Sequence, residues 1–317
     1  MQIELRAPLP YNGRVSDEKQ RPIDAATRFC AVFGHPIRHS ASPAMQNAGI
    51  AALSLNWRYL AFEVHPDNLR TAIEGARLMG FIGLNLTVPH KLLAVEMVDA
   101  VDPQAKSWGA VNTIVFETQN NQGDWIPVGR AEEIGKVRSH GFNTDADAIV
   151  QSLKEEFSLA SLRGMTVLLL GAGGAARAAA LRLAREGVGK LILVNRTASR
   201  AAELAEAVRK ECPNVPVAEG YPDPAVDLLL NATSLGLKPN DAPPVDLAWL
   251  RKHPPRLVYD MIYRPAETAL LREAKSLGCR CANGVGMLLH QGARALELWT
   301  GKPAPLAEMR RALERPE

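Results

Sequence analysis

A glycine-rich segment in the second half of the chain has the residue types and spacing of a dinucleotide-binding loop. It stands between an apolar segment, MTVLLL, and an alanine-rich helical segment, and it consists of Gly171, Ala172, Gly173, Gly174, Ala175 and Ala176. In a G-x-G-x-x-A loop the first glycine permits a tight turn, the second lets the backbone approach a pyrophosphate, and the last small residue allows close packing. The first N–H groups of the helix would face the phosphates. The segment predicts dinucleotide binding, with a tight turn that holds no ligand as the alternative.

The residues after the next expected strand indicate which dinucleotide is bound. An NAD enzyme usually has an acidic residue there, which binds the ribose 2′-hydroxyl. This chain has Asn195, Arg196 and Thr197, followed one helical turn later by Arg200. Arg196 can hold a 2′-phosphate in a bidentate, charge-assisted contact and stack on adenine, whereas an acid would repel the phosphate. We therefore predict NADP; a solvated helix face is the alternative interpretation of the two arginines.

The order of segments predicts an α/β protein of two domains. At 317 residues the chain exceeds what one hydrophobic core usually holds. Strands alternate with helices from Phe29 onward, which predicts layers with mostly parallel strands, and the series after Gly164 has the order of a Rossmann-type domain. The expected units are an N-terminal arm at 1–28, a substrate-binding domain at 29–143 completed by helices at 285–317, and an NADP-binding Rossmann domain at 144–284.

Composition and charge argue against several classes of protein. The formal net charge is +3 and the basic residues are scattered among acids, so nucleic acid is not an expected partner. The sequence has no 18-residue apolar run, and its N-terminus carries acids and prolines where a signal peptide has an apolar core. The four cysteines are typical of buried thiols in a reducing compartment. We expect a cytoplasmic protein, monomeric or homodimeric, that binds small molecules and no membrane.

Nine motifs resemble those of shikimate dehydrogenases in identity and order, over about 29–301. They are HSASP, NLTVPHK, GAVNT, GFNTD, the glycine-rich loop, NRT, NATSLGL, YDMIY and NGVGMLLHQ. The resemblance implies NADP-dependent, reversible reduction of 3-dehydroshikimate to shikimate, within chorismate and aromatic amino acid biosynthesis. Shikimate is a small cyclohexene with a carboxylate and three hydroxyls, and these loops are dense in the polar groups that such a ligand needs.

The resemblance assigns the catalytic step to Lys91 and Asp145. Hydride transfer to a ketone develops negative charge on oxygen, which an ammonium can stabilise and protonate while a carboxylate orients it. In the oxidative direction Lys91 has to accept a proton, so a shifted pKa and a water relay both stay open. Nicotinamide chemistry needs no metal, and the spacing of the histidines suits no metal site.

The other motif residues are expected to bind substrate or cofactor. Beside Lys91 and Asp145, the resemblance implies substrate contacts from Ser40, Ser42, Thr87, Asn112, Tyr263 and Gln291, with the carboxylate on the serines. To the cofactor residues above it adds Thr233, Met261 and Gly284. Ser42 could also cap the helix that Pro43 begins. The two domains are expected to close around the ligands.

Three features depart from the family pattern, and two other functions stay open. Gln46 replaces the usual His, Ala146 and Ala148 replace glycines, and the polar stretch Thr118–His140 is unusually long, which suggests a hairpin, an interface or a lid. A quinate or aminoshikimate dehydrogenase is the nearest alternative, although relatives acting on quinate often have Thr in place of Ser42. A catalytically silent NADP-binding sensor is the other.

Overall fold

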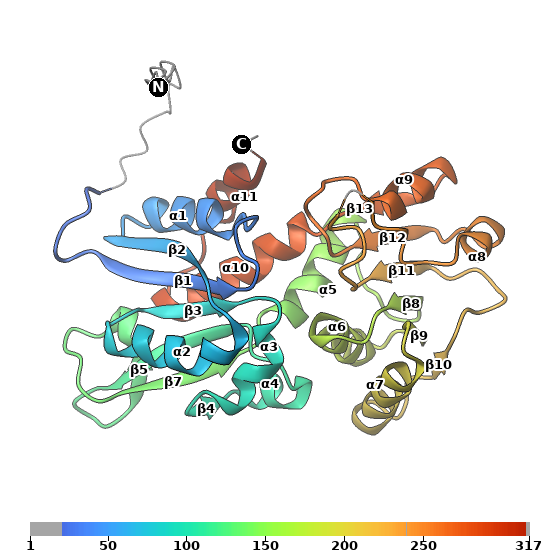
Figure 1. Cartoon of the computed structure of the whole chain (residues 1–317). Coiled ribbons are helices and arrows are strands. Elements are labelled where there is room, and N and C mark those ends of the chain that lie inside the picture. The colour runs from blue at the N-terminus through green and yellow to red at the C-terminus, as the bar shows by residue number, and fades with distance from the viewer. Residues whose placement is uncertain (1–20, 239, 315–317) are drawn as a thin grey trace, which may run out of the picture.

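The computed structural model describes residues 21–238 and 240–314, and in these ranges the chain forms two separate sheets with helices packed on them (Figure 1). The last seven residues before the first strand, 21–27, have no helix or strand, and the remainder of the expected arm lies outside the described residues. The first half of the chain builds one sheet and the second half builds the other. This arrangement is the two-domain α/β fold that the sequence predicts.

The sheet of the first half is mixed. Its strands are β1 (Arg28–Gly34), β2 (Trp57–Glu63), β3 (Gly83–Leu86), β4 (Ala100–Val101), β5 (Thr113–Gln119), β6 (Trp125–Pro127) and β7 (Val137–Phe142). Their order is β2-β1-β3-β5-β7-β4, with β6 paired to β5. β1 is parallel to β2 and β3, but β5 is antiparallel to β3, β6 and β7. The sheet has fewer parallel pairs than expected because short turns, rather than helical crossovers, connect β5 to β6 and β7.

The polar stretch Thr118–His140 is a hairpin that extends this sheet. Thr118 pairs with Val137 across β5 and β7, and Glu117 pairs with Arg138. The Arg138 and Glu117 side chains form an ion pair of 2.8 Å, and the Arg138 guanidinium lies 4.3 Å from the Trp125 ring centre. Of the three alternatives for this stretch, the structure therefore supports the hairpin.

Helices and short 3₁₀ turns connect these strands. They are α1 (Ser42–Ala52), η1 (Pro66–Asn68), α2 (Leu69–Leu78), α3 (His90–Leu93), η2 (Ala94–Glu96), α4 (Pro103–Trp108) and η3 (Val128–Arg130). The sequence does not single out α4, which has only six residues. Its N-cap is Asp102, whose side chain accepts hydrogen bonds from the backbone N–H groups of Gln104 and Ala105, and it ends at Gly109 in the left-handed region. These two caps define a helix too short for apolar periodicity to reveal.

We expect Asp102→Ala to lower the free energy of unfolding by about 1 kcal/mol, because it leaves the first N–H groups of α4 without their acceptor. Asp102→Asn keeps a side-chain oxygen in the same place and should cost much less. Urea unfolding followed by tryptophan fluorescence measures both, since Trp108 ends α4 and is buried. Equal losses in the two variants would mean that the side chain does not stabilise the protein as a cap.

The sheet of the second half is wholly parallel. Its strands are β8 (Thr166–Leu170), β9 (Lys190–Val194), β10 (Val217–Glu219), β11 (Leu228–Asn231), β12 (Leu257–Asp260) and β13 (Arg280–Ala282), in the order β10-β9-β8-β11-β12-β13. Counted from β8, this is the order 3-2-1-4-5-6 of dinucleotide-binding sheets. The packed helices are α6 (Gly174–Arg185), α7 (Ala198–Glu211), α8 (Leu247–Lys252) and α9 (Ala269–Ser276). The Rossmann-type prediction is confirmed.

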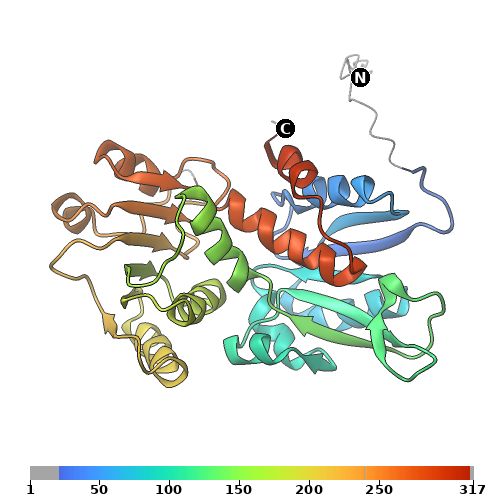
Figure 2. The same ribbon diagram turned by 180° about the vertical axis from the view of Figure 1, so that it is seen from behind.

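Three more helices complete the fold: α5 (Asp145–Glu156), α10 (Val285–Thr300) and α11 (Leu306–Glu314). The chain passes between the two halves at α5 and α10. Figures 1 and 2 show α10 running from the second sheet to the first, with α11 returning beside α1. Met287 near the start of α10 packs in the core of the second half, whereas Trp299 near its end packs in the core of the first. The expected domain boundaries at 143/144 and 284/285 stay a prediction, and they fall where α5 and α10 begin.

Candidate active site

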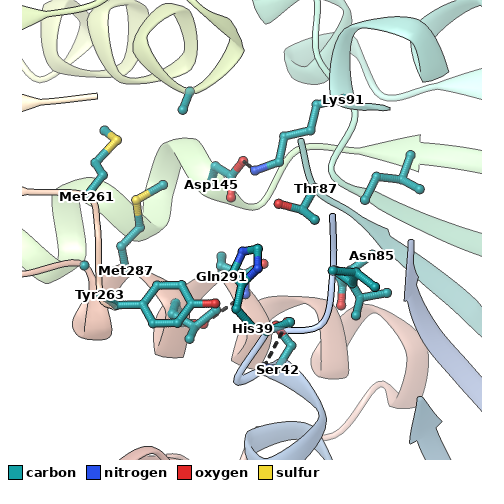
Figure 3. Close-up of a pocket in the computed structure, with 17 residues that line it drawn as sticks. His39, Ser42, Asn85, Thr87, Lys91, Asp145, Met261, Tyr263, Met287 and Gln291 are labelled. Carbon is teal, nitrogen blue, oxygen red and sulfur yellow. Dashed lines mark hydrogen bonds and ion pairs between the residues drawn. The ribbon is translucent and has the colours of Figure 1, made fainter. Parts of the chain in front are cut away.

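A cavity of about 200 Å³ lies between the two halves of the chain, where α5 and α10 begin. Seven of the eight residues predicted to touch substrate line it: Ser40, Ser42, Thr87, Lys91, Asp145, Tyr263 and Gln291. Figure 3 shows Thr87 and Lys91 on one side of this cavity and Met261 and Tyr263 on the other. The cavity therefore collects polar side chains from segments that are far apart in the sequence.

Lys91 and Asp145 meet in the wall of this cavity. The Lys91 ammonium donates to Asp145 Oδ2 at 2.7 Å, and the side chains are 19% and 5% exposed. Lys91 is the second residue of α3 and Asp145 is the first residue of α5. Burial makes this charge pair stronger than a surface ion pair, and Figure 3 shows the two groups pointing toward each other at the edge of the open space. The pair can donate a proton to a ligand oxygen and keep its donor oriented.

The neighbouring His90 adds no positive charge beside Lys91. Its side chain is fully buried, and this burial lowers the pKa of the imidazole, with His35 and His65 acting in the same direction. His90 is therefore neutral near pH 7, and the charge at this edge of the cavity belongs to Lys91 and Asp145.

Asp145 is held in place by side chains of the two loops that precede it. Asn143 Oδ1 accepts hydrogen bonds from the backbone N–H groups of Asp145 and Ala146, while its Nδ2 donates to the Ala110 carbonyl. Asn112 Oδ1 accepts from the Thr144 N–H at 2.7 Å. The start of α5 is thus tied to the segment after α4, which explains how a helix terminus can present a carboxylate in one defined direction.

Asn112, the eighth predicted substrate residue, does not line the cavity. It is 1% exposed, and its amide makes hydrogen bonds with Thr144 and Thr113. In this structure Asn112 supports the Asp145 loop, and its direct contact with substrate stays a prediction.

The serine motif meets the cavity at the start of α1. Ser40 Oγ accepts a hydrogen bond from the Ser42 N–H, and both side chains line the cavity. The expected cap by Ser42 is wrong: α1 already begins at Ser42, and its N-cap is Ala41, which makes no side-chain cap. A residue inside the first turn cannot reach the N–H groups that an N-cap satisfies, so the Ser42 hydroxyl can turn toward the cavity instead.

Asn85, which was not predicted to bind substrate, also lines the cavity and is 6% exposed. The available signal was a polar residue at the end of an otherwise apolar strand, within the NLTVPHK motif. His39 and Met287 line the cavity as well and were not assigned a role in binding. A buried amide at the carboxyl end of a strand is a natural ligand contact in an open α/β sheet.

A second cavity of about 570 Å³ follows the carboxyl edge of the second sheet. Six of the predicted cofactor residues line it: Gly171, Ala172, Gly173, Asn195, Arg196 and Thr233. Ala175, Met261 and Gly284 instead line the first cavity. Gly174, Ala176, Thr197 and Arg200 are in neither lining, although Ala176 is buried in the core at the closely packed position expected of it, and Thr197 is the N-cap of α7. The glycine-rich loop thus runs from one cavity to the other.

The backbone of this loop suits a pyrophosphate. Gly171 has φ +108°, a conformation that strongly favours glycine, and a Cβ there would lie 3.1 Å from the Ala232 carbonyl oxygen. No heavy atom lies within 4 Å of the Cβ position of Gly173, so the backbone is open toward the cavity. Gly174 is the first residue of α6, whose N–H groups are directed at the same space. The residues present therefore fit the dinucleotide that the motif predicts.

The Arg196 side chain is available for a 2′-phosphate. It is exposed at the end of β9, lines the second cavity, and has no hydrogen bond or ion pair with another described residue. Asn195 turns back on the chain, donating to the Thr197 carbonyl. No acidic side chain stands at the end of β9, so the local charge favours a phosphorylated ribose.

Two buried polar residues hold the strand ends that border both cavities. Asn231 Nδ2 donates to Asp260 Oδ1 at 2.9 Å, and Asn231 Oδ1 accepts from the Thr233 N–H and hydroxyl. Asp260 also accepts from Thr268 and from the Ile262 N–H. Burial raises the pKa of Asp260, although these hydrogen bonds oppose the shift. The network therefore connects Thr233, which lines the second cavity, to the segment after β12, whose residues Met261 and Tyr263 line the first cavity.

The described ranges 21–238 and 240–314 were compared with the side-chain groupings of metal sites and the helix lengths of membrane spans. They contain no group of three or more His, Cys, Asp or Glu side chains arranged to hold a metal ion. None of their helices has the length and apolarity needed to cross a membrane. The four cysteines are free thiols.

A parallel dinucleotide-binding sheet facing a polar cavity that contains a lysine–carboxylate pair defines a two-domain nicotinamide-dependent oxidoreductase. Family models agree in three segments: a shikimate dehydrogenase substrate-binding domain matches residues 32–114, shikimate/quinate 5-dehydrogenase matches 152–233, and a shikimate 5′-dehydrogenase C-terminal domain matches 284–314. The chain belongs to the shikimate dehydrogenase family.

Relatives match over nearly their whole length. The chain is 43% identical to a shikimate dehydrogenase (NADP(+)) of Moorella thermoacetica, covering 92% of this chain and 94% of the relative. It is 40% identical to that of Methanopyrus kandleri, covering 92% and 96%. A structure of Thermus thermophilus shikimate 5-dehydrogenase with NADP(H) and shikimate has TM-score 0.75, 34% identity and coverage of 91% and 99%. A 5-ketofructose reductase of Gluconobacter is also similar, with TM-score 0.73, 33% identity and coverage of 92% and 99%.

Proposed function

We propose that this chain catalyses the reversible, NADP-dependent reduction of 3-dehydroshikimate to shikimate. The observation that carries the proposal is the position of the Lys91–Asp145 pair, 2.7 Å apart in the wall of a small polar cavity that the dinucleotide loop also borders. Relatives covering more than nine-tenths of the chain are NADP-dependent shikimate dehydrogenases, and they support the same substrate and cofactor. The reaction belongs to chorismate and aromatic amino acid biosynthesis.

The mechanism uses Lys91 as the proton donor to the carbonyl oxygen. NADPH, when bound, supplies the hydride. The Lys91 ammonium stabilises the negative charge that develops on oxygen and transfers its proton there, while Asp145 keeps the ammonium directed at that oxygen. Because the pair is largely buried, each of these interactions is stronger than it would be in water. Oxidation of shikimate uses the same groups in reverse.

The remaining cavity residues bind and orient the ring. Ser40 and Ser42 hold the carboxylate near the start of α1, where helix N–H groups also favour an anion. Thr87, Asn85 and Gln291 present hydrogen-bonding groups for ring hydroxyls, and Tyr263 and Met261 close the side toward the nicotinamide. Asn112 acts from outside the cavity in this structure, through the loop that carries Asp145.

The cofactor lies along the second cavity in this proposal. Gly171, Ala172, Gly173 and the N–H groups that follow hold the pyrophosphate, and Arg196 with Arg200 and Thr197 holds the 2′-phosphate. Thr233 contacts the ribose or nicotinamide end, next to Met261 and Gly284. The free thiols fit a reducing cytoplasm, where we place the enzyme as a monomer or a homodimer.

Steady-state assays with purified protein test the proposal against its alternatives. NADP⁺ reduction is followed by nicotinamide absorbance with shikimate, quinate, aminoshikimate and the reduced form of 5-ketofructose, each repeated with NAD⁺. We expect shikimate with NADP⁺ to give the highest kcat/KM. A higher kcat/KM with another polyol would assign that substrate instead, and binding of NADP without turnover of any of them would support the sensor.

A further inference from the structure

Tyr59 is a fully buried tyrosine in β2 whose hydroxyl reaches a cavity residue without entering the cavity itself. The Tyr59 O–H donates to Asn85 Oδ1 at 2.8 Å. Asn85 lines the cavity and Tyr59 does not. The two residues stand on strands that flank β1 on opposite sides, so the phenol crosses one strand to reach the amide.

Three hydrogen bonds determine the orientation of the Asn85 amide. While Tyr59 donates to Oδ1, Asn85 Nδ2 donates to Thr113 Oγ1 at 3.0 Å and to the Asn112 carbonyl at 3.4 Å. The reversed amide would place Oδ1 against the Asn112 carbonyl oxygen, which is unfavourable. In the observed orientation both N–H groups of the Asn85 amide donate hydrogen bonds. Its Oδ1 accepts one hydrogen bond, from Tyr59, and has a second lone pair for another donor. Asn85 therefore offers the cavity an acceptor, which suits a ligand hydroxyl.

The backbone and ring of Tyr59 are themselves held rigidly. Asn47 of α1 accepts from the Tyr59 N–H and donates to its carbonyl, both at 2.9 Å. The ring packs against Trp299, with ring centres 6.2 Å apart. Burial raises the pKa of the Tyr59 phenol well above its usual range, and a hydrogen bond with Ser42 only partly opposes this. The hydroxyl therefore keeps its proton and acts as a donor throughout the working pH range.

We infer that Tyr59 is a specificity-determining positioning residue, which holds Asn85 as an acceptor for one of the ring hydroxyls that do not react. The inference rests on the proposed function, since it concerns recognition of that substrate. A hydroxyl at the matching ring position satisfies Asn85 Oδ1, and a ligand without it leaves that oxygen unpaired in a largely buried site.

Tyr59→Phe removes the one hydroxyl and keeps the ring that packs on Trp299. We expect the KM and the calorimetric dissociation constant for shikimate to rise about 3- to 10-fold, the loss expected for one buried hydrogen bond. kcat should stay within about threefold, and the KM for NADP⁺ should not change. Shikimate analogues that each lack one non-reacting hydroxyl identify the contact: for one of them, wild type and Tyr59→Phe should bind equally well.

Tyr259→Phe is the matched control. Tyr259 is also fully buried, and its hydroxyl lies 2.8 Å from Ser152 Oγ in the other half of the chain. This variant loses a comparable hydrogen bond, so it measures the general cost of removing a buried phenol hydroxyl. Shikimate affinity in Tyr259→Phe should match that of the wild type. Equal losses of affinity in the two tyrosine variants would overturn the inference.

Two further variants test the route through Asn85. Tyr59→Phe combined with Asn85→Ala should be no weaker in shikimate binding than Asn85→Ala alone, as expected when the hydroxyl acts through that amide. A further loss in the double variant would mean that the hydroxyl acts through its hydrogen bond with Ser42 instead, and would overturn the inference. Thr113→Val removes the acceptor for Asn85 Nδ2 and so frees the same amide. If Tyr59→Phe fails to fold, this variant should show the same loss of shikimate affinity. Unchanged shikimate affinity in a folded Tyr59→Phe protein defeats this inference alone. A wild-type protein that neither binds nor oxidises shikimate defeats the proposed function, and the inference with it.

Discussion

Lys91→Met should lower kcat for shikimate oxidation by about 10²- to 10⁴-fold, the usual contribution of one general acid–base group. Methionine keeps most of the apolar length of lysine and removes the ammonium, so the lost interaction is the one with the charge on the substrate oxygen. That charge develops in the transition state. Truncation should therefore reduce kcat far more than it raises KM.

Substrate binding should survive in Lys91→Met because other groups hold the carboxylate and the hydroxyls. Calorimetry with shikimate measures this directly, and the dissociation constant should rise much less than kcat falls. The loss of the charge also leaves Asp145, which is only 5% exposed, without its partner. A modest loss of stability is therefore expected, and it is measured separately by thermal unfolding.

Lys154→Met is the matched control for the loss of a lysine–carboxylate pair. Lys154 Nζ lies 2.9 Å from Glu186 Oε2, so its geometry resembles that of the Lys91 pair, but it connects α5 to the C-cap residue of α6 and does not line the cavity. Its kcat should stay close to that of the wild type. If Lys91→Met kept kcat within about threefold of wild type, the proton-transfer role would have to be abandoned.

The pair can also be tested as a unit. Asp145→Asn should slow turnover and weaken shikimate binding as well, since the carboxylate both orients Lys91 and faces the cavity. The double variant should lose less than the product of the two single losses, because each single change already disables the shared function. Fully multiplicative losses would indicate that the two residues act independently.

The cofactor loop could be predicted from the sequence because its requirements are local. Six consecutive residues between a strand and a helix contain the tight turn and the exposed backbone, and Gly171 has the positive φ that this interpretation requires. The same holds for the apolar helix α10 (Val285–Thr300), which begins at the start of the helical segment expected at 285–317. The short helices α8 and α9 were missed, since neither spans enough turns to show a clear period.

The orientation of the side chains near the substrate cavity depends on hydrogen-bond partners far away in the sequence. Motifs alone therefore predict it less completely. Asn85 lines the cavity, and the orientation of its amide is fixed by Tyr59 and Thr113, 26 and 28 residues away. Asn112 is turned away because its amide bonds to Thr144. Motifs identify the loops that meet, but these long-range hydrogen bonds decide which of the two asparagines lines the cavity.

Arg196→Ala should lower the affinity for NADP by about 10- to 150-fold and leave NAD affinity nearly unchanged. The change removes a charge-assisted contact worth roughly 1.5 to 3 kcal/mol, and this contact exists only when the ribose carries a phosphate. Arg196 is exposed, and no other described residue occupies its guanidinium, so its removal breaks no internal hydrogen bond. The measurement is calorimetric titration with both dinucleotides, together with kcat/KM for each.

Arg209→Ala is the control for the loss of a positive charge near this site. Arg209 lies on the same helix, α7, but near its end, where it pairs with Glu206 and Glu219. Long-range attraction for a phosphorylated ligand would weaken in both variants and would disappear at high salt, whereas a direct contact is lost only with Arg196. We therefore expect Arg209→Ala to keep the wild-type preference for NADP, and Arg200→Ala to fall between the two. A wild-type enzyme that uses NAD as well as NADP would rule out the 2′-phosphate assignment, whatever the variants do.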